Sequence, residues 1–289
     1  MKPLFVESIG QAAPGLPGWS DSRATVAGKA PYVPAELAPF SPELLPPNER
    51  RRATATVRLA FRCAEDALRG SSLPAADLAT VFASADGDME VVNRINQSLA
   101  APARTVSPTD FHNSVHNAPA GYWSIAVGAR QPSTSLAAHD ASFAAALLEA
   151  AALAVGDHLN VLLAMYDIKA PAPLAAKRPT PQSFGVALVL TPARTANSFA
   201  ALQLANLEAA ETRMADAALE ALRAGNAAAR CLPLLRLLAR HEPGTVVLPG
   251  VGSALAITTA PPPDYNTRGQ APDYSTRGQA PDYSTRGQA

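Results

Sequence analysis

The spacing of two histidines, His112 and His116, is one used by zinc sites on helices, because residues four apart lie on one helix face. A third ligand, such as His139 or Asp140, would have to come from a more distant part of the chain. Prolines stand on both sides of the histidine pair, and no glutamate follows the first histidine. We therefore expect no metal site, and interpret the two histidines as residues that pack a loop.

Asp140 comes immediately before an apolar segment that predicts a helix. Aspartate is among the preferred N-cap residues, where its carboxylate accepts a backbone hydrogen bond and stabilises the helix by about 1 kcal/mol. We expect Asp140 to cap this helix. Asn117 is expected to fix a local turn through hydrogen bonds from its side chain to the backbone.

A longer pattern links these residues. From Val115 to Asp140 the chain reads VHNAPAGYWSIAVGARQPSTSLAAHD, in which an Asn, two Gly and a Pro-Ser pair precede the corner at Asp140. This stretch resembles the β-ketoacyl-acyl carrier protein synthases of the thiolase superfamily, where these residue types occur at this spacing before the nucleophile. The resemblance covers residues 1–195 well. Beyond them it rests on smaller, chain-length-factor-like relatives that end near residue 258.

Two departures from that family bear on function. The resemblance implies a cysteine at the corner, whose thiolate takes the acyl chain as a thioester, and here the position is Asp140. A carboxylate is a poor acyl acceptor, because its attack on a thioester would give a reactive mixed anhydride. Full synthases also contain a second, histidine-bearing half, whereas this chain has only His241 after residue 198. We expect no catalytic residue, no cofactor and no catalysis by the chain alone.

The resemblance implies a non-catalytic, chain-length-factor-like subunit that forms a heterodimer with an active β-ketoacyl synthase and shapes its acyl tunnel. Its setting would be a bacterial pathway of the aryl-polyene, polyketide or fatty-acid type, in which acyl carrier protein delivers substrate to the partner. Full synthases dimerise across the region that matches 132–138. Residues expected to contact the partner or line the tunnel are Asn117, Gly121, Pro132, Ser133, Ser135, His139 and Asp140.

Two other functions remain open. One is a stand-alone acyltransferase or thioester hydrolase that uses His112, His116, His139 and Asp140. The other is a plain scaffold protein, for which residues along the tunnel would not influence the length of the product.

The elements that must position these residues form an α/β fold, a thiolase-like half with a mixed sheet, a buried central helix and outer helices. Alternating or continuous apolar runs predict strands, and apolar residues three and four apart predict helices. The helix over 141–155 is apolar on nearly every face, so we expect it to be buried. The segment up to residue 48 reads mostly as loop. Strands are expected over 2–9, 78–83, 135–138, 159–166, 184–190, 246–248 and 254–258, and helices over 53–68, around 91–99, and over 141–155, 198–224 and 227–241.

The composition argues against a nucleic-acid-binding, a disulfide-rich or a membrane-spanning protein. The 24 basic and 24 acidic residues give a net charge of zero, which leaves no positive excess for nucleic acid. Two cysteines cannot build a disulfide framework, and the longest apolar stretch, 143–155, is too short to span a bilayer, so we expect a cytoplasmic protein. We divide the chain into a domain over 1–258 and a tail over 259–289. The tail repeats a nine-residue unit three times and should be disordered, because it has too few apolar residues to form a core.

Overall fold

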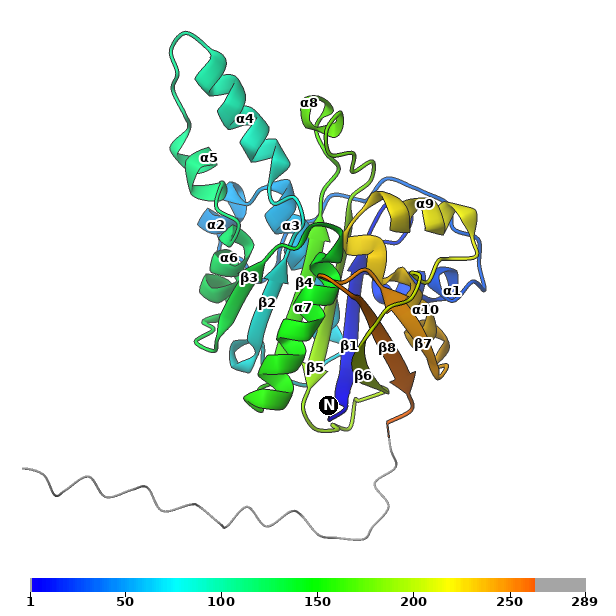
Figure 1. Ribbon diagram of the computed structural model, residues 1–289. Helices are drawn as coiled ribbons and strands as arrows, with labels where there is room; N and C mark the ends of the chain where they lie inside the picture. The colour runs from blue at the N-terminus through cyan, green and yellow to red at the C-terminus, as the bar shows by residue number, and fades with distance from the viewer. Residues whose placement is uncertain (1, 263–289) are drawn as a thin grey trace, which may run out of the picture.

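An eight-stranded mixed sheet runs through the computed structural model, which describes residues 2–262 (Figure 1). Its strand order is β3-β2-β4-β5-β1-β6-β8-β7, so neighbours in the sheet are often distant in the sequence. The strands are β1 (Leu4–Ala12), β2 (Ala79–Ala83), β3 (Ser133–Leu136), β4 (Val161–Asp167), β5 (Phe184–Thr191), β6 (Ala200–Leu207), β7 (Gly244–Leu248) and β8 (Ala254–Ala260).

The parallel part of the sheet carries the candidate site. Strands β3 and β4 both pair with β2 in parallel, while the remaining pairs are antiparallel. Between β3 and β4 the chain crosses over through α7 (Ser142–Ala151), which confirms the helix expected between the strands predicted over 135–138 and 159–166 and makes a β-α-β unit. Because parallel strands end at one edge of a sheet, the residues that follow β2, β3 and β4 are brought together there.

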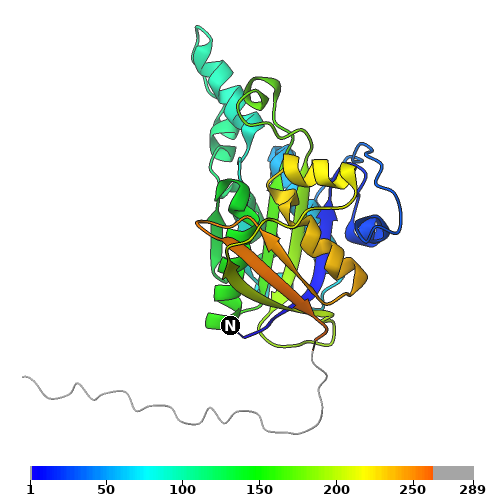
Figure 2. The ribbon, with the colours of Figure 1, turned by 45° about the vertical axis from the view of Figure 1, so that its right-hand side comes forward.

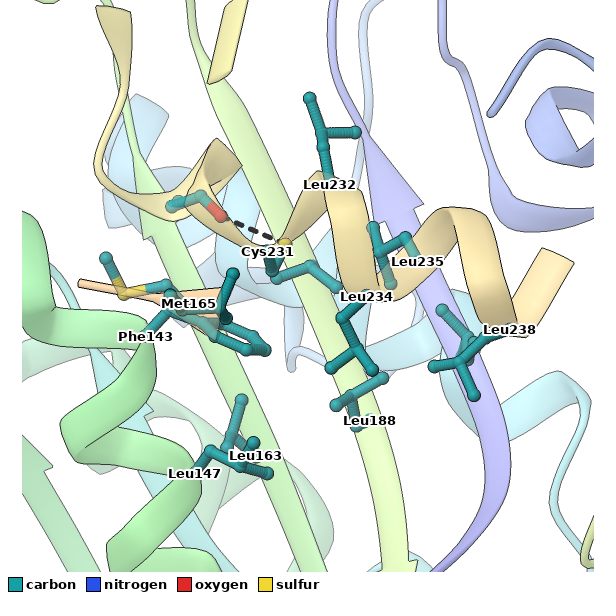
Figure 3. Packing of buried hydrophobic residues seen from close by; sticks show 14 of the residues in the cluster. Phe143, Leu147, Leu163, Met165, Leu188, Cys231, Leu232, Leu234, Leu235 and Leu238 are labelled. Carbon is teal, nitrogen blue, oxygen red and sulfur yellow. Dashed lines mark hydrogen bonds between the residues drawn. The ribbon is translucent and has the colours of Figure 1, made fainter. Parts of the chain in front are cut away.

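Two apolar layers cover the two faces of the sheet. One is built by α3 (Ala55–Arg69) and α6 (Ala118–Val127), and the other by α7 and α10 (Leu232–Arg240). The central strands are buried on both faces, which explains why they read as continuous apolar runs. Figure 3 shows α7 and α10 packing side chains on the same face of β4 and β5, including Phe143, Leu147, Leu163 and Leu188.

The remaining helices are shorter or lie at the periphery. They are α1 (Trp19–Val26), α2 (Pro47–Arg52), α4 (Met89–Ala100), α5 (Pro108–Asn113), α8 (Ala172–Ala175) and α9 (Ala217–Gly225). Helices α4 and α5 form an arm that projects beyond the sheet in both views (Figures 1 and 2). The bidentate pairing of Arg94 with Asp110 joins the two helices of the arm.

Two expectations about local structure need correction. The predicted helix over 198–224 is instead β6 followed by α9, because the Ala-Leu run pairs in register with β1 and β8. The segment before residue 48, expected to be mostly loop, contains α1 and the first residues of α2. The helix expected over 141–155 is α7 followed by a π-helical turn over Ala152–Gly156, and most of its apolar residues are buried as expected, although Leu148 is 41% exposed.

The described residues contain no helix that is long and apolar enough to cross a membrane. Of the predicted tail over 259–289, residues 263–289 lie outside the described residues. Strand β8 continues to Ala260, two residues past the expected end of the domain.

Candidate functional site

Polar residues gather where the parallel strands end. Asp86 follows β2, Asp140 follows β3, and Asp167 is the last residue of β4. Two arginines reach these carboxylates from elsewhere: Arg178, from the loop after α8, and Arg230, from a single 3-10 turn over Ala228–Cys231. We call these five residues the corner cluster.

Asp140 lies between the two arginines. Its Oδ1 accepts a hydrogen bond from Arg178 Nη2 at 2.9 Å, and its Oδ2 accepts one from Arg230 Nη2 at 3.2 Å. Burial alone would raise the pKa of Asp140, but the hydrogen bond from Arg178 and the charges of both arginines together lower it below the ordinary value. The carboxyl therefore remains ionised and is fully engaged in ion pairs.

The prediction that Asp140 caps the helix is wrong. Helix α7 begins after Ala141 without a hydrogen bond from a capping side chain. The hydroxyl of Ser142 instead joins the corner, because it accepts from the Ala138 N–H at 2.9 Å and donates to the His139 carbonyl. Both arginines carry a full positive charge, so each contact with the Asp140 carboxylate is an ion pair as well as a hydrogen bond.

Arg178 also fastens a loop over the site. Its Nε donates to Asp86 Oδ1 at 2.8 Å, and the hydroxyl of Thr180 donates to Asp86 Oδ2 at 3.0 Å. Both residues come from the segment between β4 and β5, which closes on itself where the Ala170 N–H donates to the Thr180 carbonyl. The Asp86 side chain, which is 9% exposed, thereby holds this loop against the end of β2.

A chain of alternating charges continues away from Asp140. Arg230 pairs with Glu211 at 3.3 Å, and Glu211 pairs with Arg223 at 2.9 Å. Arg223 in turn makes two hydrogen bonds to Glu220 on its own helix, α9. These ion pairs connect the corner after β3 with α9 and with the segment that precedes α9. Together with the loop that carries Arg178, they fix the position of Asp140.

Asp167 is the buried member of the cluster, and its side chain is inaccessible to solvent. Its Oδ1 accepts hydrogen bonds from the Ser84 hydroxyl at 2.7 Å and the Asp86 N–H at 3.2 Å, while Oδ2 has no partner among the described residues. Burial raises the pKa of Asp167 to about 7, with a further contribution from the negative charge of Asp86.

The three histidines considered in the sequence, His112, His116 and His139, do not form one site. His116 Nε2 lies 2.9 Å from the Ser84 carbonyl, beside the corner cluster, whereas the ring of His112 meets Tyr122 edge-on at 6.0 Å. The His139 side chain is 74% exposed and its Nδ1 lies 3.5 Å from Asp140. Within residues 2–262, no three His, Cys, Asp or Glu side chains are placed to hold a metal ion.

Neither cysteine reaches the corner cluster as a nucleophile. Cys63 is buried in α3, and Cys231 is buried at the start of α10, where its thiol donates to the Ala228 carbonyl (Figure 3). Burial raises the pKa of both thiols well above the ordinary value. Neither can present a thiolate to a bulky acyl donor without local unfolding.

The residues predicted to contact a partner fall in three places. His139 and Asp140 belong to the corner, whereas Pro132, Ser133 and Ser135 lie on or beside β3, which pairs with β2 only. Asn117 and Gly121 line a groove of about 400 Å³ beside α6. Asn117, expected to fix a local turn through its side chain, precedes α6 and makes no capping hydrogen bond to that helix. Other lining residues of the groove include Phe111, Val115 and Ile125.

Sequence reasoning missed the roles of Arg178, Arg230 and Asp167. Asp167 had a usable signal, because a carboxylate at the end of a fully apolar strand must lie at the carboxyl edge of the sheet. The two arginines had none. Arg178 lies in a proline-rich loop without periodicity, 92 residues from Asp86 in the chain.

Comparisons with known proteins agree with this architecture. A family model described as "Beta-ketoacyl synthase, N-terminal domain" matches residues 23–242. A chain from the structure of the ketosynthase ApeO in complex with its chain length factor ApeC, from Xenorhabdus doucetiae, is 25% identical with a TM-score of 0.67, over 89% of this chain and 99% of that one. No curated protein matches the sequence.

Two further structures share the fold at lower identity. A chain from the ishigamide ketosynthase/chain length factor is 16% identical with a TM-score of 0.67, over 89% of this chain and 98% of that one. A chain from the AntDE:AntF structure, a type II acyl-carrier protein in complex with its ketosynthase, is 13% identical with a TM-score of 0.70 and the same coverage. The thiolase-like α/β fold expected from the sequence is thus confirmed.

Proposed function

The chain belongs to the family of β-ketoacyl synthase N-terminal domains, and we propose that it acts there as a non-catalytic, chain-length-factor-like subunit. In this proposal it forms a heterodimer with an active β-ketoacyl synthase and contributes to the wall of the partner's acyl tunnel. The matched chain from the ApeO–ApeC complex, nearly all of which is covered, supports this assignment.

The free edge of β3 is the observation that carries the proposal. The backbone N–H groups of Thr80 and Ser84 bond to the carbonyls of Pro132 and Leu136, so these residues face β2. Because backbone groups alternate along a strand, Ser133 and Ser135 point theirs away from the sheet, where a strand of another chain can pair with them.

Exposed apolar side chains lie on and just before α6, the helix next to this strand. Phe111 is 72% exposed, Val115 52% and Ile125 62%, and all three line the groove beside α6. Helix α6 packs against β3. We call Ser133, Ser135 and these three residues the β3 face. An edge strand beside a patch of large apolar side chains is typical of a protein interface. The strand offers unpaired backbone N–H and C=O groups, and the patch offers apolar surface that association would bury.

The corner cluster supports a non-catalytic role. The carboxylate of Asp140 is held by Arg178 and Arg230, and both cysteines of the chain are buried. A chain with this arrangement offers no thiolate for acyl loading. Acyl carrier protein would accordingly deliver substrate to the partner. We further propose that the product is of the aryl-polyene or fatty-acid type, and that pairing occurs in the cytoplasm, where free thiols persist.

An interface variant tests the proposal directly. Ile125→Asp places a charge on the exposed side of α6 and should abolish co-purification with a cognate β-ketoacyl synthase, since a buried unpaired charge costs several kcal/mol. Val251→Asp is the matched control, because Val251 is 73% exposed in the loop between β7 and β8. Equal capture of the synthase by wild type and Ile125→Asp would refute the proposed interface.

The hydrolase alternative finds less support. A covalent mechanism requires His139 to activate a hydroxyl or thiol, yet in the described part of the chain none bonds to the His139 ring, and the Ser142 hydroxyl donates to the backbone instead. Thioester turnover by the purified chain, lost on His139→Ala, would favour this alternative over the one that we propose. A plain scaffold would pair with the synthase without influencing product length.

A further inference from the structure

The C-termini of α1 and α10 lie side by side, and an arginine from each helix donates a hydrogen bond to a backbone carbonyl at the end of the other. Arg23, on α1, donates from Nε to the Ala239 carbonyl near the end of α10 at 3.0 Å. In return, Arg240 on α10 donates from Nε to the Ala27 carbonyl, just after α1. Cations are favourable at helix C-termini, so these two arginines have a structural reason to be there.

In the part of the chain that the structure describes, two more cations lie near these helix ends without a comparable hydrogen bond to a helix carbonyl. Lys29 and Arg236 make no ion pair with a carboxylate of the described residues, although both line one groove. Arg236 Nη2 and Arg240 Nη2 each lie 3.3 Å from the position that a Cβ on Gly28 would occupy. The two guanidinium groups therefore converge on one point of the backbone, where they repel each other unless an anion lies between them.

Positive charges outnumber negative charges near this point. Four cations, Arg23, Lys29, Arg236 and Arg240, surround the Gly28 turn, and among the described residues the one carboxylate that forms an ion pair with any of them is that of Glu242, 3.4 Å from Arg240 Nη1. Asp216 also lines the groove, but its Oδ1 caps α9 by accepting from the Leu219 N–H. Burial, together with the charges of Arg23 and Lys29, lowers the pKa of His241 below its ordinary value.

The groove has the size and lining of a small-molecule site. Its volume is about 370 Å³, which lies within the range of small-ligand pockets, roughly 300 to 1,000 Å³. Its lining combines the cations Lys29 and Arg236 with the apolar residues Val26, Pro31 and Leu219. The arrangement fits a molecule that carries an oxyanion beside an apolar portion.

We propose that this groove between α1 and α10 binds a soluble ligand through a phosphoryl or diphosphate group held by Arg236, Arg240 and Lys29. Guanidinium groups match phosphate oxygens with paired N–H donors, and two convergent arginines with one lysine can neutralise a multiply charged group. The Gly28 backbone, which has a φ of +75°, leaves the ligand close access to both arginines because it carries no side chain.

Calorimetric titration of the full chain with pyrophosphate tests the proposal. Wild type should bind, and Arg236→Gln and Lys29→Gln should each weaken the affinity about tenfold, as expected for the loss of one charge-assisted contact. Arg130→Gln is the matched control, because Arg130 is exposed, lies before β3 and changes the net charge equally. Thermal unfolding of each variant verifies that it is folded.

Three results would overturn the proposal. One is the absence of pyrophosphate binding to wild type at millimolar concentration. Another is an equal loss of affinity in Arg130→Gln, which would indicate a nonspecific charge effect. The third is binding to vesicles that contain phosphatidate without binding to pyrophosphate, which would assign the basic groove to a lipid surface. None of these results bears on the β3 face, so pairing with a synthase is tested separately.

Discussion

Arg178 Nη2 lies 2.9 Å from Asp140 Oδ1, and this contact ties the loop between β4 and β5 to the corner after β3. The same guanidinium reaches Asp86 at the end of β2. One arginine thus neutralises two carboxylates that parallel strand ends bring together. Its removal would leave Asp86 with the hydroxyl of Thr180 as its side-chain partner, and Asp140 with Arg230 and His139.

Arg178→Ala should lower the free energy of unfolding by about 2 to 3 kcal/mol, because it leaves the nearly buried carboxylate of Asp86 without its charged partner. Arg94→Ala is the control: Arg94 pairs with Asp110 on the exposed arm, and its loss should cost less than about 1 kcal/mol. Urea unfolding at neutral pH measures both. Equal losses would show that the Arg178 contacts contribute no more than a surface pair.

Asp167 should make the protein less stable as the pH rises toward neutrality. Burial places its folded-state pKa at about 7, above the ordinary value of 3.8, so the folded state retains a proton that the unfolded state has released. Between these two values its contribution to the unfolding free energy falls by up to about 1.4 kcal/mol per pH unit.

Asp167→Asn removes this titration, and the slope of unfolding free energy against pH between about pH 4 and 7 should flatten. The neutral amide can still accept hydrogen bonds from Ser84 and the Asp86 N–H. The control is Asp77→Asn at an exposed position, which should retain the wild-type slope. An unchanged slope in Asp167→Asn would show that this carboxyl does not titrate in the neutral range.

The sequence was most informative where periodicity and burial coincide. The β-α-β unit around α7 and the helix α3 could be predicted, since apolar side chains at strand or helix spacing must face the two layers. Strand β6 could not, because its alanines and leucines favour a helix and only pairing with β1 and β8 makes it a strand.

The candidate site was predictable only in part. Asp140 stood out because its position follows a recognisable motif, but its partners Arg178 and Arg230 are 38 and 90 residues away. Ion pairs of this kind depend on tertiary structure and have no local pattern. For the same reason the sequence favoured a helix cap for Asp140, which is the choice that local geometry alone would make.

Asp140→Cys should create a reactive thiol without creating a condensing enzyme. The thiol would lie beside Arg178 and Arg230, whose charges lower a thiol pKa. Native protein should therefore be alkylated once by iodoacetamide in the variant and not in wild type, where Cys63 and Cys231 are buried. Mass spectrometry counts the adducts.

The same variant should form no carbon–carbon bond when it is supplied alone with acyl and malonyl thioesters. Our reason is the resemblance, which implies that condensation needs histidines from a second half. Condensed product from the isolated variant would contradict this expectation. Alkylation of wild type at the same rate would show that a buried cysteine is accessible after all.

Ser135→Pro should weaken pairing with the synthase while leaving the fold intact. Its N–H points away from β2, so a proline removes a donor from the free edge of β3 without breaking the existing ladder. Ser135→Val is the matched variant, since valine retains the N–H and favours a strand. We expect at least about tenfold weaker capture of the synthase by the proline variant than by the valine variant, with similar unfolding midpoints. If both variants capture the synthase equally, the partner does not extend the sheet at β3, and the apolar side chains of the β3 face must carry the contact alone.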